Sequence, residues 1–323
     1  RGLGDVYKRQ DVLISLGRKM KYIKIVLKYI VLLFFISVFL FILTRSIPVD
    51  PVKMLLQQYQ LPETEQNVQA LREQWGLNES YAVQYTRWMS AFLSGDWGVS
   101  LISKQNIRQE IFRGIPYSMT LGIGAILISS VLGFFLGYLA SLKKGGFFDR
   151  LTAFLSILTQ TVPLFMFCVV LIYYVGVKYK LARIFTGDVY VKMTLAIFLT
   201  AFASVGSIAR IMKKHFLKIQ NQSYIKAEMA RGFLLSEALL TAGVKPALIG
   251  LCSAIISKFA WVIGGSSVVE FIFSIHGVSF FLISGIMQRD YNIIQSYLFF
   301  IVIWMMVVHL VFEIFIKFLG ERE

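Results

Sequence analysis

Ionisable side chains inside apolar stretches are the residues of this chain whose types and places could do chemistry. Lys258 and Glu270 lie in one apolar stretch, and His309 and Glu313 lie four residues apart in another. A charge in such surroundings is costly to bury, so it predicts an ion or substrate path or a structural pairing. Lys258 could face a pore, pair with Glu270 or snorkel to an interface, and we expect an interior or subunit-interface position for it.

These side chains do not form a catalytic or metal-binding constellation. His309 and Glu313 share one helical face, but two ligands are too few for a metal site, so we expect a structural contact. The three histidines are dispersed, and Cys168 and Cys252 fall in apolar stretches without ligand spacing. The sequence also lacks the G-x-x-x-x-G-K-[ST] loop that binds nucleotide phosphates. It therefore predicts no catalytic residue, no metal site and no cofactor.

The composition indicates that these residues lie in a membrane. Apolar residues make up 57% of the chain and charged residues 16%, against about a quarter charged in soluble domains. The apolar residues cluster in blocks of the length that a spanning helix needs, roughly 20 residues. The net charge of +15 arises from basic residues that flank these blocks, which is typical of contacts with anionic lipid rather than nucleic acid. The sequence therefore predicts a multi-pass membrane protein without a nucleic-acid partner.

Six apolar blocks predict an all-α fold with six transmembrane helices. They lie near residues 23–43, 117–142, 151–177, 191–212, 247–273 and 296–319. Lys and Arg gather before the first block, between the second and third, and between the fourth and fifth, which places these segments and both termini in the cytoplasm. A short segment with Lys178, Lys180 and Arg183 is then outside, but its charges are outnumbered. Gly264 and Gly265 could let the fifth span bend.

The segments between the spans complete the predicted organisation. Residues 1–19 are expected to be a non-native extension, because Met20 begins a basic run that leads into the first span. The segment that follows this span has aromatic and aliphatic residues at helical spacing, so it predicts a folded extracytoplasmic part. The expected parts are an extension (1–19), a tail with the first helix (20–44), the extracytoplasmic segment (45–116), the transmembrane core (117–319) with a cytoplasmic loop (213–246), and a C-terminal tail (320–323).

The cytoplasmic loop has the pattern of two short amphipathic helices. The first is predicted from Tyr224 to Arg231 and ends at Gly232, because glycine readily adopts the left-handed conformation that commonly follows a helix. The second is predicted over roughly 235–242. Such a pair could form a lever that docks on a soluble motor, or it could be an interfacial helix lying among lipid headgroups.

This loop resembles the coupling loop of ABC importer permeases, which has an E-A-A-x-x-x-G core. Ala227 and Gly232 match that core, whereas Lys226 and Glu228 replace its first and third residues. The loop is more similar to the version found in peptide and nickel permeases, through Tyr224, Ala227, Ala230, Arg231 and Gly232. The resemblance implies that separate ATPase subunits dock on Tyr224, Lys226, Ala227, Glu228, Ala230, Arg231 and Gly232.

Three further segments resemble this family in the family's own order. Residues 44–52 resemble an Arg-x-x-Pro-Gly-Asp-Pro signature after the first span, with Val in place of Gly. Residues 71–101 resemble the pattern of the extracytoplasmic segment, and residues 264–291 resemble the exit of the fifth span, including a Val-Val-Glu that ends at Glu270 and a final Arg-Asp-Tyr. The matching signature residues are Arg45, Pro48, Asp50 and Pro51.

The resemblance implies a permease with type I ABC importer architecture in the cytoplasmic membrane. Its implied partners are a second homologous permease, two ATP-binding subunits that hydrolyse ATP, an extracytoplasmic substrate-binding protein and membrane lipid. Its implied substrates are peptides, with nickel or another chelated metal second. Glu270 and Lys258 are expected in gating or along the translocation path. The alternative is an ion-gradient-driven secondary transporter, which would show inverted repeats or paired interrupted helices that this sequence does not display.

Overall fold

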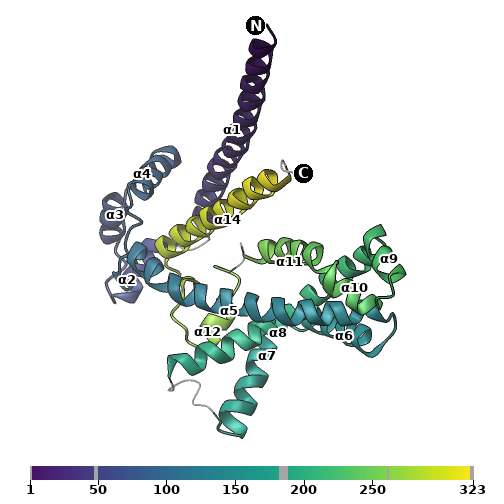
Figure 1. Cartoon of the computed structure of the whole chain (residues 1–323). Coiled ribbons are helices and arrows are strands. Elements are labelled where there is room, and N and C mark those ends of the chain that lie inside the picture. Colours follow the sequence, from purple (N-terminus) through teal and green to yellow (C-terminus); the bar gives the residue numbers. More distant parts are fainter. Residues whose placement is uncertain (1, 47–49, 182–187, 260–261, 321–323) are drawn as a thin grey trace. The chain divides into compact units, whose positions relative to one another are not determined.

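The computed structural model describes residues 2–46, 50–181, 188–259 and 262–320. These residues form helices joined by turns, with one isolated antiparallel bridge between Val99 and Asn106. The chain divides into two compact units, one of Arg1–Arg108 with Gly285–Glu323 and one of Gln109–Ser284. Figure 1 labels helices of both units.

The first unit is built on two long apolar helices. These are α1 (Gly2–Arg45) and α14 (Tyr291–Gly320), which pack against each other (Figure 1). The Tyr29 hydroxyl of α1 donates a hydrogen bond of 3.1 Å to the Glu313 carboxylate of α14. Lys28 lies 3.8 Å from the same carboxylate. Glu313, which the sequence places in an apolar stretch, therefore makes a structural contact between the two helices.

Three short helices follow α1, namely α2 (Pro51–Gln58), α3 (Glu65–Gln74) and α4 (Tyr81–Leu93). Their ends follow from local sequence. Asp50 caps α2 by accepting a hydrogen bond from the Val52 amide at 3.0 Å, and Pro51 occupies a first-turn position that needs no amide donor. Thr64 caps α3 in the same way, through the Asn67 amide at 3.3 Å.

Aromatic side chains join α4 to both long helices. Phe41 of α1 and Phe299 of α14 lie 6.2 Å and 5.3 Å from the Trp88 ring of α4, measured between ring centroids. Phe92 of α4 stacks on Trp97 at 4.7 Å. Aromatic pairs at these separations contribute roughly 0.5–1.5 kcal/mol each beyond the area that they bury. Helix α4 is therefore packed onto α1 and α14.

The second unit is centred on α5 (Ile107–Leu142) and α8 (Val189–Gln220). Close approach of these helices depends on glycine, since a methyl group at Gly133 would lie 2.6 Å from the Ile208 side chain. A methyl group at Gly206 of α8 would likewise lie 2.7 Å from the Leu155 backbone of α6 (Phe147–Thr161). Lys213 of α8 also forms an ion pair with Asp149 of α6.

The remaining helices of this unit are shorter. They are α7 (Leu164–Leu171) with a π-helical continuation η1 (Ile172–Lys178), α9 (Ser223–Ala230), α10 (Leu235–Thr241), α11 (Val244–Phe259), α12 (Ser267–Ile272) and the first part of α13 (Val278–Met287). In the described part of the chain, four helices are long and apolar enough to cross a membrane. The number rises to six if each of two bent helix pairs is one span.

Two predicted spans are interrupted in the structure. The predicted span 151–177 is bent by 96° between α6 and the helix that α7 and η1 form together, Leu164–Lys178. The bend occurs because Pro163 lacks an amide donor and forces Val162 into an extended conformation (φ −87°, ψ 120°). The predicted span 247–273 is not one helix either. Helix α11 ends at Phe259, and α12 begins only after a turn in which Gly264 has φ +106°.

The second predicted span also begins earlier than the sequence indicated. Helix α5 starts at Ile107 rather than at residue 117 and contains Pro116. The first turns of α5 are polar, so the apolar blocks of the sequence do not indicate where this helix begins. A proline ten residues into an otherwise apolar helix is tolerated in membrane proteins when neighbouring groups satisfy the backbone carbonyl that it frees.

Candidate functional site

The predicted coupling loop forms two helices separated by a tight turn. Helix α9 ends at Ala230, and Gly232 follows with φ +100°. The Gly232 amide donates to the Met229 carbonyl at 3.0 Å and the Phe233 amide donates to the Glu228 carbonyl at 3.3 Å. This pair of bonds is a Schellman motif, which satisfies the last carbonyls of a helix. A side chain at position 232 would meet open space, so lack of room does not explain the glycine. The backbone angle does, because φ +100° strains any residue that has a side chain.

The start of α10 is set by a carboxylate. Glu237 accepts a hydrogen bond of 2.9 Å from the Leu234 amide, which precedes the first turn of the helix. A negative charge there also interacts favourably with the helix dipole. The turn between α9 and α10 is therefore defined at both ends by residues of the loop itself.

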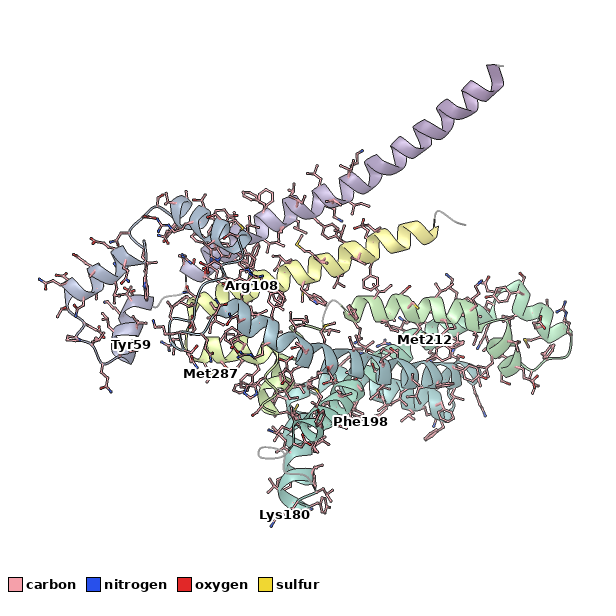
Figure 2. All side chains as sticks on the ribbon, turned by 60° about the vertical axis from the view of Figure 1, so that its left-hand side comes forward. Tyr59, Arg108, Lys180, Phe198, Met212 and Met287 are labelled. Atoms are coloured by element: carbon pink, nitrogen blue, oxygen red, sulfur yellow. The ribbon has the colours of Figure 1, made fainter. Side chains whose placement is uncertain are left out.

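One face of these helices is anchored to α5 and α8. Ile225 of α9 and Leu239 of α10 are fully buried, in a cluster with Met212 and Phe216 of α8. Met212 is labelled in Figure 2. The Tyr138 hydroxyl of α5 donates to the Ser236 carbonyl at the start of α10 at 3.1 Å. A displacement of α9 and α10 would therefore be passed to two long helices through packed side chains.

The end of α9 and the turn that follows it carry exposed apolar side chains. Met229, Phe233 and Leu234 are 45%, 46% and 66% exposed. Sequence reasoning missed these three residues, although large apolar residues on both sides of a helix-ending glycine could have indicated them. Exposed apolar residues gathered at one place are typical of a protein-binding surface.

The predicted docking residues lie on α9 and on the turn that follows it. Six of them are exposed and Glu228 is partly buried. Arg231 donates to the Glu228 carboxylate at 3.0 Å, one helical turn away. The structure therefore brings together the set Tyr224, Lys226, Ala227, Glu228, Ala230, Arg231 and Gly232.

Glu270 is a fully buried carboxylate with four hydrogen-bond donors. Its Oε1 accepts from the hydroxyls of Ser118 and Ser266 at 2.7 and 2.6 Å. Its Oε2 accepts from the backbone amides of Ser279 and Phe280, each at 3.0 Å. These amides belong to the first turn of α13, where backbone donors have no partner within the helix. Glu270 of α12 therefore joins α5 to the beginning of α13.

Gly277 is part of the same arrangement. A side chain there would collide with the Glu270 carboxylate and the Ser118 hydroxyl. The Ser118 hydroxyl in turn accepts a hydrogen bond of 2.9 Å from the Val278 amide. Ser118 and Ser266 were not singled out from the sequence, since each is a small residue in an apolar segment, whereas Gly277 lies within residues 264–291, which resemble the family.

Lys258 is not among the partners of Glu270. The four donors are neutral hydroxyls and amides, and the ion pairs within the described residues do not include one between Lys258 and Glu270. Lys258 lies in the last turn of α11 and is partly buried. The pairing considered from the sequence is therefore wrong, and the other roles of Lys258 stay predictions.

The signature residues after the first span lie in the first unit. The guanidinium of Arg45 donates to Gln295 at 2.6 Å, and Asp50 forms an ion pair with Arg72 at 2.5 Å. Burial opposes ionisation of Asp50, but hydrogen bonds from Arg72 and from backbone amides outweigh it and lower the pKa of this carboxyl. Pro51 begins α2, and Pro48 lies outside the described residues.

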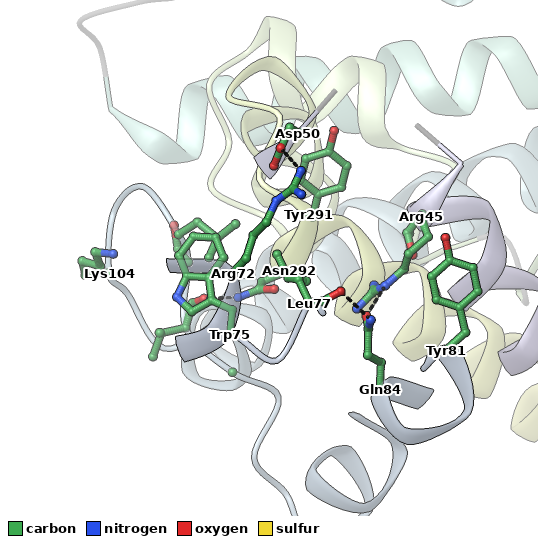
Figure 3. Close-up of a pocket in the computed structure, with 15 residues that line it drawn as sticks. Arg45, Asp50, Arg72, Trp75, Leu77, Tyr81, Gln84, Lys104, Tyr291 and Asn292 are labelled. Carbon is green, nitrogen blue, oxygen red and sulfur yellow. Dashed lines mark hydrogen bonds and ion pairs between the residues drawn. The ribbon is translucent and has the colours of Figure 1, made fainter. Parts of the chain in front are cut away.

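Arg45 and Asp50 both line one pocket of about 690 Å³ (Figure 3). The Arg-Asp-Tyr sequence at residues 289–291 is nearby in the same unit, and Asp290 is fully buried there. Asp290 accepts from the Ser100 hydroxyl at 2.6 Å and from the Ile293 amide at 3.2 Å. It therefore caps α14 and holds the loop before α5.

The described residues are helical, and several of the helices are apolar and long enough to span a bilayer. Two short helices, α9 and α10, are anchored to them. These features define a multi-pass membrane protein. No group of three or more His, Cys, Asp or Glu is placed to hold a metal within the described residues. The comparisons with known proteins name its class.

The chain belongs to the family of binding-protein-dependent transport system inner membrane components. The family model matches residues 129–323, and the model of the family's N-terminal part matches residues 20–122. Both the predicted family and the predicted all-α permease fold are therefore confirmed. The chain is a multi-pass permease component of the ABC importer class and lies in the inner membrane.

Known relatives are similar along most of their length. The chain is 29% identical over 276 residues to a probable peptide ABC transporter permease, y4tP of Sinorhizobium fredii, covering 81% of this chain and 86% of the relative. It is 29% identical over 267 residues to the oligopeptide transport system permease OppB of Haemophilus influenzae, covering 82% and 86%. It is 24% identical over 298 residues to the nickel import system permease NikB of Staphylococcus aureus, covering 92% and 89%.

Proposed function

We propose that this permease imports peptides and is driven by two separate ATP-binding subunits that dock on α9 and α10. The observation that carries the proposal is that the helices are anchored to the unit while the turn between them is apolar and exposed. Ile225 and Leu239 are buried against the unit, whereas Phe233 and Leu234 are exposed. Exposed apolar side chains on a rigid support suit a permanent partner better than a mobile lipid contact.

Coupling would then follow from packing. Closure of the ATPases would displace α9 and α10, and the displacement would reach α5 and α8 through Tyr138, Phe216 and Leu239. Densely packed side chains move as a body rather than deform, so a shift at the docking surface would be transmitted to the membrane helices. ATP hydrolysis itself is assigned to the partner subunits.

Peptides are proposed as the substrate class, with nickel or another chelated metal as the second candidate. The peptide and oligopeptide relatives share 29% identity with this chain, and the nickel relative shares 24%. A second homologous permease would complete the pathway, and an extracytoplasmic binding protein would deliver the substrate. Both termini are proposed to be cytoplasmic. The segments between the second and third spans and between the fourth and fifth spans lie on the same side as the termini, and they are rich in Lys and Arg, which is typical of cytoplasmic segments.

Glu270 is proposed as a latch in the translocation part of the permease. Its carboxylate fixes the first turn of α13 to α5 through four hydrogen bonds. Breaking and remaking these bonds would be one way to couple movement of α5 to a change at α13. Lys258, in the last turn of α11, is proposed to line the path or a subunit interface.

The docking proposal is tested by placing a charge on the exposed apolar turn. Leu234→Glu is expected to lower ATPase recovery in a pull-down of the tagged chain by about tenfold, as for a central interface residue. Leu61→Glu is the matched control, because Leu61 is 49% exposed in the loop between α2 and α3. Equal recovery from both variants would contradict docking at α10. Uptake by the purified chain alone, driven by an ion gradient without ATP, would instead support a secondary transporter.

A further inference from the structure

The pocket of the first unit has an excess of positive charge. Among the residues that line it are three cations, Arg45, Arg72 and Lys104, and one carboxylate, Asp50 (Figure 3). Asp50 is already paired with Arg72 at 2.5 Å. Three cations against one carboxylate leave two positive charges, which belong to Arg45 and Lys104.

Arg45 is held in place by neutral groups. Its Nη1 donates to the Gln295 side-chain oxygen at 2.6 Å and its Nε donates to the Gln84 oxygen at 3.4 Å. The Gln84 amide group donates to two backbone carbonyls, which directs its oxygen toward Arg45. The guanidinium also lies 4.3 Å from the centroid of the Phe41 ring. These contacts orient Arg45, but none of them neutralises it.

This arrangement leaves Arg45 able to bind an anion. Within the described residues no carboxylate lies at ion-pair distance from it. A guanidinium has five N–H donors, and the two side-chain bonds use two of them. A partly buried cation without a counter-charge is unfavourable, so an anionic ligand that reached it would be bound strongly.

The position of the pocket indicates where that anion comes from. Arg45 is the last residue of the apolar span Ile23–Arg45, and Tyr291 is the first residue of the span Tyr291–Ile314. Both line the pocket, together with Trp75 and Tyr81. The ends of spanning helices lie at the level of the lipid headgroups, and Trp and Tyr are enriched there.

We propose that this pocket binds the phosphodiester group of an anionic phospholipid. Arg45 is the main ligand, because its free donors match phosphate oxygens. Lys104, an exposed cation that lies away from Arg45 in Figure 3 and over the Tyr59 ring at 5.6 Å, adds a longer-range attraction rather than a direct contact. The site is separate from α9 and α10 and does not depend on the proposed coupling function. It would tie the helices after the first span to the membrane surface through a lipid.

The test uses the full chain, purified with its partners and stripped of lipid. Phosphatidylglycerol or phosphatidylcholine with the same acyl chains is added back, and native mass spectrometry measures the bound fraction. Arg45→Gln is expected to weaken phosphatidylglycerol binding by about tenfold or more, because it removes charge-assisted hydrogen bonds. Arg87→Gln is the matched control, since Arg87 is paired with Glu79 at 2.6 Å and does not line the pocket. Phosphatidylcholine carries the same phosphodiester beside a choline cation, so we expect it to bind more weakly to the wild type and to lose less affinity in Arg45→Gln, with no change in Arg87→Gln.

A second variant keeps the test decisive if Arg45→Gln does not fold. Lys104 is exposed with φ +59°, a left-handed conformation that Asn tolerates, so Lys104→Asn removes the charge with little strain. It should weaken phosphatidylglycerol binding by roughly two- to fivefold. Equal affinity for both lipids in all forms would overturn the proposal. Displacement of the lipid by inorganic phosphate at similar concentration, or by an acidic peptide, would assign the pocket to a soluble anion or a protein segment and would also overturn it.

Discussion

Replacing Glu270 tests whether this buried carboxylate is needed for its hydrogen-bond acceptor atoms or for its negative charge. If hydrogen bonding explains it, the acceptor atoms matter more than the charge. Gln at position 270 keeps an oxygen that can accept from the Ser279 and Phe280 amides, and its amino group can donate to the Ser118 and Ser266 hydroxyls after these rotate. Ala at the same position removes every acceptor.

The magnitudes follow from this inventory. Glu270→Ala leaves two buried backbone amides unpaired, at about 1–3 kcal/mol each, and adds a cavity, so we expect a loss of about 3–5 kcal/mol. Glu270→Gln keeps four hydrogen bonds but loses the strengthening that a charge gives them, so we expect a loss of about 1–2 kcal/mol. Ser118→Ala and Ser266→Ala should each cost about 1 kcal/mol.

The assay is thermal unfolding in detergent, followed by the loss of the monodisperse peak on size exclusion. The expected order of stability is wild type, then Glu270→Gln, then Glu270→Ala. Equal damage from the two substitutions would refute the hydrogen-bond reasoning and indicate that the charge itself is needed. Lys258→Met is a further check. Its effect should add to that of Glu270→Gln within about 0.5 kcal/mol, because residues that do not interact behave independently.

Two other predictions address the coupling turn and the segment after the first span. Gly232→Ala should destabilise the end of α9 by about 1 kcal/mol, because φ +100° disfavours a side chain although no atom blocks it. Gly232→Asn should cost less than Gly232→Ala. Hydrogen exchange of the amides in the turn measures this, and we expect faster exchange in the Ala variant than in the Asn variant. The reverse order would contradict the prediction. Asp50 has a lowered pKa in the folded chain, so its contribution to stability is complete above the unfolded value of about 4 and is lost as the pH falls through the lower folded value. Asp50→Asn should therefore flatten the fall in melting temperature below pH 5, whereas Glu63→Gln, at an exposed site nearby, should leave it unchanged.

The apolar blocks predicted the fold because spanning helices have a strong signature. A bilayer requires every backbone group to be bonded within its segment, so long apolar runs must become helices. Interruptions were harder to place. Pro163 is visible in the sequence, but a proline can kink a membrane helix slightly or break it, and only the structure distinguishes these outcomes by its 96° bend. The polar start of α5 at Ile107 likewise carries no apolar signal.

The coupling loop shows how far local sequence can reach. Gly232 and Glu237 define the ends of α9 and α10 through bonds to residues within four positions, so the two helices could be predicted from the loop alone. Their orientation could not be predicted. Which side faces Phe216 and which side exposes Leu234 depends on where α5 and α8 lie.

The sequence by itself determined the class of this protein, since hydropathy, basic flanks and local helix signals all act over short distances. The tertiary structure alone decided the buried polar arrangements. Ser118 and Glu270 are 152 residues apart, and Arg45 and Gln295 are 250 apart, yet each pair shares a hydrogen bond. Small polar residues have no periodic pattern that would mark them in the chain. They become partners only when the packing of apolar helices has excluded water and left the buried charges in need of donors and acceptors.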